Sequence, residues 1–262
     1  MANDDNSNDD RGYENDRSDI AALATEVISA LNERSEVAAQ SIRASVVRKL
    51  VKATLRGGAF NAEMLLRDLQ DQRVVPDQIV DIYIPAAARE LGVMWCDDAI
   101  GFAKVTIASA RLQGLLTLLA PPWSAKALDP DKAVSTLLIL QSNDSHTLGP
   151  HVATAQLRRM GASVRLLFGP DSETVLQILN EEHYDLVMFS GSRTDSLATI
   201  AKMVKRIRTE LSVAPPLVMG GLVLNLTDRV KEKTGVDMVT SDVKIAFKLC
   251  DKKRLQHRAL AR

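Results

Sequence analysis

The sequence has few cysteines, few aromatic residues and no excess of charge of either sign. Its two cysteines, Cys96 and Cys250, form neither a CxxC pair nor a Cys/His spacing, so we expect reduced thiols and not a zinc site or a disulfide framework. Lys and Arg total 33 and Asp and Glu total 33. This balance argues against electrostatic binding of nucleic acid by the protein surface as a whole. No apolar run reaches the ~18 residues of a membrane span, and no signal segment opens the chain. These absences predict a soluble, cytoplasmic protein without a membrane partner.

The chain is 262 residues long, with 46% hydrophobic and 25% charged residues, which is typical of a globular protein of one large or two modest domains. Residues 1–19 carry seven acidic and two basic side chains and almost nothing apolar, which predicts a disordered acidic leader. Residues 20–120 have apolar side chains at three- and four-residue spacing and predict a helical bundle. Residues 121–132, rich in proline, predict a linker, and residues 133–262 a second domain.

The two predicted domains differ in the period of their apolar residues. In the first, helices are expected near residues 20–33, 37–56, 60–72, 76–93 and 100–119. In the second, short apolar runs predict strands at 134–140, 164–168, 186–189, 217–219 and 236–239. Between and after these strands, helices are expected near 150–160, 172–180, 195–210 and 225–233 and from residue 242 onward. Buried strands that alternate with helices predict an α/β fold, a doubly wound, Rossmann-like sheet of five parallel strands.

The segment after the first predicted strand holds the most informative residues. Ligands of open α/β sheets bind at the carboxyl ends of the strands, and this segment contains neither GxGxxG nor a P-loop. It does place Asp144 two residues before His146. The carboxylate can accept a hydrogen bond from one imidazole nitrogen and leave the other for a metal. One histidine is too few for zinc but suits a metal already held by a macrocycle, cobalt corrinoid or haem alike.

Small residues follow two other predicted strands. Ser190, Gly191 and Ser192 follow the third strand, and Gly220 and Gly221 follow the fourth. Together they predict a deep slot at the sheet edge, suited to a long, flat ligand tail. Taken singly, the serines fit helix caps and the glycines an ordinary turn.

Together these residues resemble the D-x-H-x-x-G, S-x-L and G-G motifs of the cobalamin (vitamin B12)-binding domain. The matching parts are Asp144-x-His146-x-x-Gly149, Ser190-x-Ser192 and Gly220-Gly221, with forty and twenty-seven residues between them. Ser192 departs from the pattern, which usually has Leu. The resemblance implies cobalamin as cofactor, with His146 coordinating cobalt from below in place of the dimethylbenzimidazole base and Asp144 orienting it. The residues it assigns to the cofactor are Asp144, Ser145, His146, Thr147, Leu148, Gly149, Ser190, Gly191, Ser192, Gly220 and Gly221.

The resemblance also implies that the helical bundle caps the upper corrin face. Trp95 is then expected to contact the corrin edge, although it would equally serve as a core anchor. The Glu-His pair that usually follows this Trp is absent, and all four histidines lie beyond residue 133. The bundle therefore offers no imidazole above the cobalt, unlike the light-sensing B12 repressors. His151 and His183 are predicted to be surface residues.

The whole arrangement, with Leu91-Gly92-Val93-Met94-Trp95 in the helical part, resembles the PpaA/AerR family of antirepressors. This implies a photoreceptor-like, cobalamin-dependent transcriptional regulator, not an enzyme, that acts through a partner repressor of photosynthesis and tetrapyrrole genes. The alternative is a corrinoid carrier subunit of a methyltransferase. A mutase fragment is disfavoured, because 262 residues leave no room for a ~250-residue catalytic barrel beside these domains. No helix-turn-helix or zinc finger is evident, so we expect weak or absent DNA contact. A solvated helix face is the expected role of the basic residues Lys202, Lys205, Arg206 and Arg208.

Overall fold

The computed structural model describes residues 42–120 and 133–250. From residue 45 onward these belong to one compact unit. The expected acidic leader, the helix near residues 20–33 and the linker at 121–132 lie outside the described residues. Within the described ranges, no helix is long and apolar enough to cross a membrane.

The first described range is helical, as predicted. Its elements are α2 (Ala44–Leu55), α3 (Ala62–Asp71), α4 (Pro76–Gln78), the π-helical turn η1 (Ile79–Tyr83), α5 (Ile84–Cys96) and α6 (Phe102–Leu119). The sequence predicted one helix over 76–93, and the structure instead inserts the π turn and continues to residue 96. These helices bury a common core that includes Leu50, Leu91 and Leu112, and Val152 and Ala155 from the second half join it.

The second range contains the predicted five-stranded parallel sheet. Its strands are β1 (Val134–Leu140), β2 (Ala162–Phe168), β3 (Leu186–Ser190), β4 (Leu217–Gly220) and β5 (Met238–Val239). They pair in the order β2-β1-β3-β4-β5, and every neighbouring pair is parallel. The strand order reverses direction next to β1, so the carboxyl ends of β1 and β3 flank a topological switch point, the usual ligand position in this architecture.

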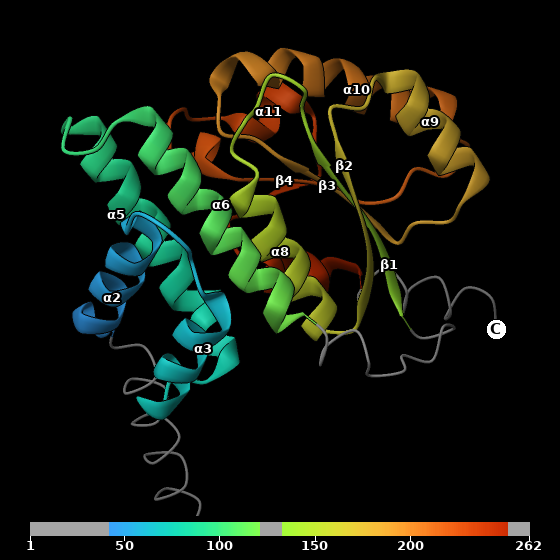
Figure 1. The fold of residues 1–262 in the computed structure, drawn as a ribbon. Helices are drawn as coiled ribbons and strands as arrows, with labels where there is room; N and C mark the ends of the chain where they lie inside the picture. Colours follow the sequence, from blue (N-terminus) through green and yellow to red (C-terminus); the bar gives the residue numbers. More distant parts are fainter. Residues whose placement is uncertain (1–41, 121–132, 251–262) are drawn as a thin grey trace, which may run out of the picture. The chain divides into compact units, whose positions relative to one another are not determined.

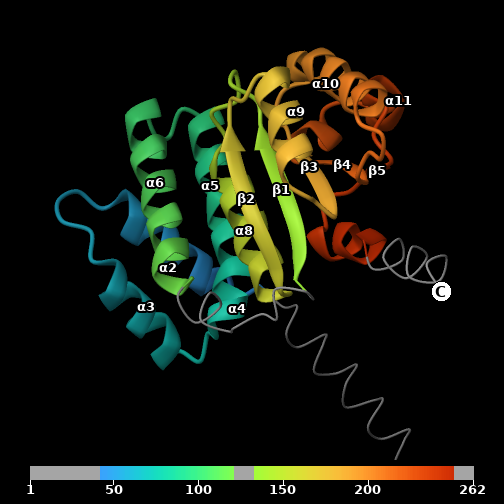
Figure 2. The ribbon, with the colours of Figure 1, turned by 90° about the vertical axis from the view of Figure 1, so that its right-hand side faces the viewer.

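Helices cover both faces of the sheet (Figure 2). They are α8 (Leu148–Arg159), α9 (Ser172–Glu181), α10 (Leu197–Glu210) and α11 (Val230–Thr234), with 3₁₀ turns η2 (Thr194–Ser196) and η3 (Leu222–Asn225) and a helix over 243–250. One apolar cluster joins the sheet to α9, α10 and α11, and a second joins it to α8 and the helix at 243–250. The helix predicted near 225–233 is confirmed only in its second half, as α11, because residues 226–229 are not helical. Arg229 adopts a left-handed backbone, with φ of 58°, and separates η3 from the short α11.

Helix α8 connects the sheet to the helical range. It packs beside α6 (Figure 1), and its last turn is held by carboxylates of the preceding helices. Asp81, in the π turn, accepts hydrogen bonds from Gln156 and Arg159, and Arg159 also pairs with Asp77. The segment that follows β1 therefore runs directly into a helix that is fixed to the bundle.

Candidate functional site

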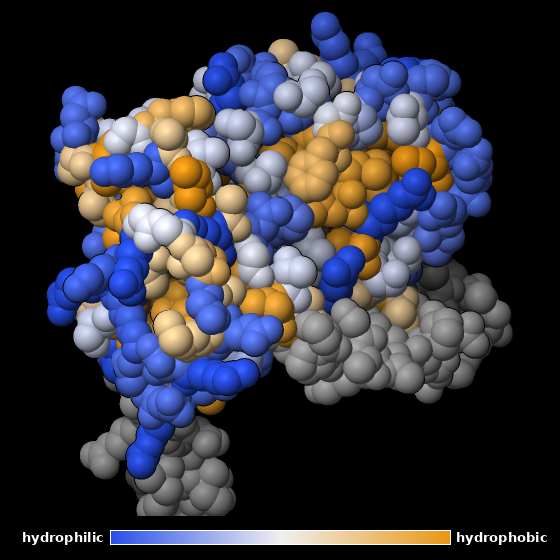
Figure 3. Space-filling model, viewed as in Figure 1, coloured by the Kyte–Doolittle hydropathy of each residue, from blue (hydrophilic) through white to orange (hydrophobic). Residues whose placement is uncertain are grey.

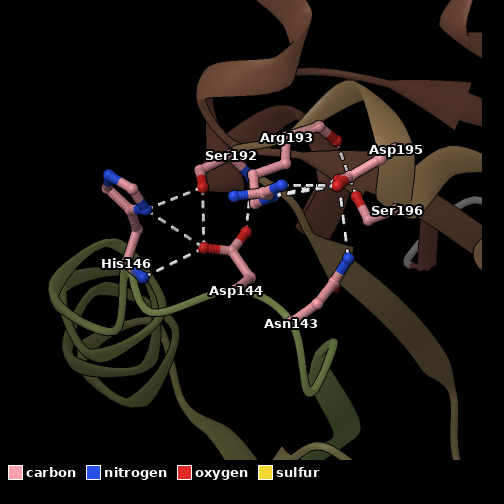
Figure 4. Close-up of polar contacts among 7 residues, drawn as sticks. All are labelled: Asn143, Asp144, His146, Ser192, Arg193, Asp195 and Ser196. Carbon is pink, nitrogen blue, oxygen red and sulfur yellow. Dashed lines mark hydrogen bonds and ion pairs between the residues drawn. The ribbon is translucent and has the colours of Figure 1, made fainter.

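Asp144 is the centre of a hydrogen-bond network at the carboxyl edge of the sheet (Figure 4). Its side chain is fully buried. Oδ1 accepts the His146 backbone N–H at 2.9 Å and the Ser192 hydroxyl at 2.6 Å, and Oδ2 accepts the Ser192 backbone N–H at 2.6 Å. The network therefore ties the end of β3 to the end of β1 through one carboxylate.

The imidazole of His146 is oriented by the same network. Its Nδ1 lies 2.8 Å from the Ser192 hydroxyl oxygen and 3.2 Å from Oδ1 of Asp144. The Ser192 hydroxyl hydrogen is used on Asp144, and a carboxylate can only accept, so Nδ1 must carry the proton. In the neutral ring Nε2 then keeps a free lone pair, and Figure 4 shows it pointing away from the network. The side chain is 56% exposed, so this lone pair is open to a ligand.

The carboxyl of Asp144 is held in its ionised form. Burial alone would raise its pKa, but hydrogen bonds from the Ser192 hydroxyl and the His146 and Ser192 backbone amides, with the nearby imidazole, bring the pKa below its ordinary value. An ionised Asp144 is the stronger acceptor and favours the Nδ1–H form of His146.

The rest of the predicted loop has several different environments. Ser145 is exposed and Thr147 precedes α8, which begins at Leu148, two residues earlier than predicted. Leu148 packs against the helical core. At Gly149 an added Cβ would meet nothing within 4 Å, so this face of the first turn is open.

The glycines do not form the open slot that the sequence predicted. Gly191 donates its N–H to the Gly220 carbonyl, and its own carbonyl accepts from Val223. Gly221 has φ of +100°, and a Cβ there would lie 2.4 Å from the Gly191 oxygen. A Cβ at Gly191 would lie 2.7 Å from Met219 Cε. The glycines therefore permit close packing of the two loops, because the backbone of one fills the space beside the other. Ser192, expected to line the slot, instead binds Asp144 and His146.

The side chain beside Ser192 has its own polar partners. Arg193 forms a forked ion pair with Asp195, and Asn143 donates to the same carboxylate (Figure 4). The pKa of Asp195 lies below its ordinary value because of the Arg193 hydrogen bond. The Ser196 hydroxyl donates a hydrogen bond to the backbone oxygen of Arg193. The positive charge of Arg193 is thus neutralised by Asp195 within the same loop.

Trp95 is on the surface of the helical range. It is 45% exposed, and the ring it contacts is Phe102, itself 70% exposed, at a centroid distance of 6.3 Å. The alternative of a core anchor is therefore wrong. Val93 and Ile107 are also exposed, and Figure 3 shows apolar surface on this part of the molecule.

His151 is not the surface residue that the sequence predicted. It is half-buried on α8, its ring lies 5.6 Å from the ring of Phe168, and its Nε2 lies 2.7 Å from Nε2 of Gln113 on α6. The amide nitrogen can only donate, so this imidazole nitrogen accepts. Burial, and to a lesser extent Arg158, lowers the pKa of His151, which favours that neutral form. Gln113 also accepts a 3.4 Å hydrogen bond from Thr147, next to His146.

The other predicted surface residues have the following positions. His183 is exposed, as predicted, beside Asp185, and His257 lies outside the described residues. On α10, Arg206 pairs with Glu173 and Glu210 and Arg208 with Asp237, which neutralises half of the basic set noted in the sequence. Among the described residues no group of three or more His, Cys, Asp or Glu could hold a metal ion.

Comparison with known proteins gives a relative and a fold. No protein-family model matches the chain. It is 31% identical over 185 residues to an uncharacterized 20.5 kDa protein of the bchF–crtJ intergenic region of Rhodobacter capsulatus, covering 71% of this chain and 96% of that protein. This chain belongs to the family of that protein.

The fold of this member of the bchF–crtJ intergenic protein family matches a solved structure. The monomethylamine corrinoid protein of Methanosarcina barkeri superposes with a TM-score of 0.63 at 16% identity, covering 78% of this chain and 94% of that one. A cobalamin-binding protein of Desulfitobacterium hafniense gives a TM-score of 0.42 at 17% identity, with 79% and 97% coverage. The first likeness places the helical range and the parallel sheet in one known fold.

Proposed function

We propose that this protein binds cobalamin, with Nε2 of His146 as the lower axial ligand of cobalt. The observation that carries the proposal is the fixed imidazole: Nδ1 is held by Ser192 and Asp144, and Nε2 is free and exposed. A single axial imidazole is what a macrocycle-bound metal needs from a protein. The fold of a corrinoid protein and the three-part motif both support this choice over haem.

The residues around His146 fit such a group. Asp144 is a charged acceptor beside Nδ1 of His146, on the opposite side of the ring from Nε2. This arrangement fixes the tautomer of metal-bound histidines. Gly149 leaves one position in the first turn of α8 without a side chain, with free space around it, which suits the approach of a flat macrocycle. Bound cobalamin would supply a cobalt–carbon bond that light can break.

We further propose a regulatory, non-enzymatic role in the cytoplasm, through a partner repressor of photosynthesis and tetrapyrrole genes. The kinship with a protein of the bchF–crtJ intergenic region supports this context. The contacts of Thr147 and His151 with Gln113 support this role, because they join the segment around His146 to α6 of the bundle. A shift of α6 would change the surface offered to a partner.

A corrinoid carrier is the second candidate, favoured by the match to a methylamine corrinoid protein. The two roles differ in what the bundle must do. A carrier presents its cobalt to a partner enzyme for methyl transfer, whereas a regulator changes its affinity for a partner when the upper ligand changes.

Cofactor binding is tested by absorption spectra. The full chain is mixed in the dark with hydroxo-, methyl- or adenosylcobalamin, desalted and measured before and after illumination. Retention with a spectral shift from base-on to histidine-ligated cobalamin is expected. His146→Ala should lose the shift, and His183→Ala, which alters an exposed histidine elsewhere, should keep it. Retention of no form by the wild type would contradict the proposal.

The role is tested with the loaded protein. A regulator should bind the purified photosynthesis-gene repressor with a dissociation constant that differs between dark and illuminated samples. Methyl transfer from methylcobalamin-loaded protein to a thiol through a methyltransferase, with no effect of light on repressor binding, would favour the carrier.

A further inference from the structure

Gln141 is a buried polar residue that lacks a hydrogen-bond partner for its amide nitrogen. It follows β1 directly, is 5% exposed, and its Nε2 has no partner among the described residues. Buried polar groups in proteins are nearly always hydrogen-bonded, and one that is not requires an explanation. A bound ligand supplies such an explanation, because it would complete the hydrogen bond only when present.

The position of Gln141 is at the switch point of the sheet. Its backbone oxygen accepts the N–H of Asp144 at 3.1 Å, so it begins the turn that carries the network. Leu140 pairs with Ser190 on β3 and with Phe168 on β2, so position 141 falls between the loops that follow these two strands. Side chains alternate along a strand, which puts Gln141 on the face of Leu137 and Ile139, the face that α9 and α10 cover.

We infer that Gln141 donates a hydrogen bond from Nε2 to an acceptor on the nucleotide tail of cobalamin. This rests on the proposed function. The amide nitrogen can only donate, so its partner must be an acceptor, such as a phosphate oxygen, a ribose oxygen or the unprotonated nitrogen of the displaced base. All three occur on the tail, which must enter beside the sheet if His146 replaces the base at cobalt. Gln141 lies outside all three motif parts, so the motif resemblance does not assign it.

Entry of a tail beside Gln141 requires the neighbouring loops to separate. The loops at Gly191 and Gly221 pack closely, since a Cβ at Gly221 would lie 2.4 Å from the Gly191 oxygen. Their separation would break the backbone hydrogen bonds of Gly191 to Gly220 and Val223. Gln141 and Gly191 directly follow the paired residues Leu140 and Ser190, so a tail that enters between the loops would lie beside Gln141.

The test compares two ligands that differ only in the tail. Gln141→Leu keeps the size of the side chain and removes the donor. Dissociation constants are measured by absorption titration for hydroxocobalamin and for cobinamide, which lacks the nucleotide. We expect Gln141→Leu to bind cobalamin about five- to tenfold more weakly, the effect of one hydrogen bond, and to bind cobinamide like the wild type.

Two controls separate binding from folding. Loss of an unpaired buried amide should leave the melting temperature of the ligand-free variant equal or higher; if it falls, Gln141→Met, a flexible side chain of similar length, replaces it in the titrations. Thr136→Val removes another buried, unpartnered polar atom of β1, four positions before the end of the strand. This control should change neither dissociation constant.

The possible outcomes are distinct. Equal cobalamin affinity of wild type and Gln141→Leu would overturn the inference while leaving the proposed cofactor intact. An equal loss for both ligands would place the contact on the corrin ring and overturn the tail assignment. Failure of the wild type to bind either ligand would overturn the proposed function, and the inference with it.

Discussion

Replacing Asp144 by Asn tests the central network without changing its shape. The wild-type carboxylate accepts on both oxygens: Oδ2 from the Ser192 backbone, and Oδ1 from the His146 backbone and the Ser192 hydroxyl. Asn has one oxygen and one NH₂ group. Whichever way its amide is turned, the NH₂ group faces a backbone N–H that has no freedom to turn away.

The expected loss of stability follows from the hydrogen bonds that Asp144→Asn removes. One hydrogen bond to a charged acceptor contributes about 1.5–3 kcal/mol, and a buried donor left unpaired costs about 1–3 kcal/mol more. The free energy of unfolding should therefore fall by about 3–5 kcal/mol, and the melting temperature by on the order of 10 °C for a domain of this size.

Thermal and urea unfolding from pH 3 to 8 measure the effect. The folded pKa of Asp144 is below its ordinary value of 3.8, so its stabilisation is fully present above pH 3.8 and is lost as the pH falls through the folded pKa. The difference between wild type and Asp144→Asn should be constant at neutral pH and shrink in acid. Equal stability at pH 7 would refute the network as described.

Cobalamin binding adds a second readout and a control. Asp144→Asn should also weaken the histidine-ligated spectrum, because Nδ1–H of His146 loses its charged acceptor. Asp185 accepts the Ser135 backbone N–H at 2.9 Å at the opposite end of the sheet. Asp185→Asn should lower stability while leaving the cobalamin spectrum unchanged.

Three further predictions concern the loops and helices around the site. Gly221→Ala should lower the free energy of unfolding by at least about 2 kcal/mol in urea titrations, because φ is +100° and the Cβ would meet a backbone oxygen. Gly149→Ala has free space around its Cβ, so this variant should fold normally while binding cobalamin more weakly. Unchanged stability of Gly221→Ala would contradict the close packing of the two loops. The pKa of His151 lies below 6.5, so the stabilisation by the neutral imidazole is present above pH 6.5 and is lost as the pH falls through the folded pKa. Melting temperatures of the wild type from pH 5 to 8 should show this loss of stability. The melting temperature of His151→Gln should not show this pH dependence. Asp81→Ala should lower the free energy of unfolding by about 1–3 kcal/mol, because it leaves the largely buried guanidinium of Arg159 on α8 with one partner fewer. Asp77→Ala, at an exposed carboxylate, should lower it by under about 1 kcal/mol. Thermal unfolding of both variants measures this difference, and equal losses would contradict it.

The sequence predicts the elements best where the signal is continuous along the chain. The apolar run over β1 has the predicted bounds, because a strand buried on both faces must be apolar throughout. The pairing of Asp144 with His146 is also local, since two residues of separation suffice for the contact. Elements with weaker local signals were predicted less accurately. The helix predicted near 225–233 begins only at Val230, and the apolar periodicity does not distinguish the π turn at 79–83 from the α-helix around it.

Contacts between distant residues were decided by the tertiary structure. Ser192 reaches Asp144 across 48 positions, and a small residue at a strand end gives no sign of whether it lines a slot or binds a carboxylate. The sequence predicts His151 to be a surface residue, but its ring lies against Phe168 and contacts Gln113 of α6. The burial of the Gln141 amide nitrogen without a partner is likewise a property of the folded chain. The chain itself determined which chemical groups are present and the order of strands and helices, whereas packing between strand ends determined which groups meet, because hydrogen bonding and burial depend on neighbours that are remote in sequence.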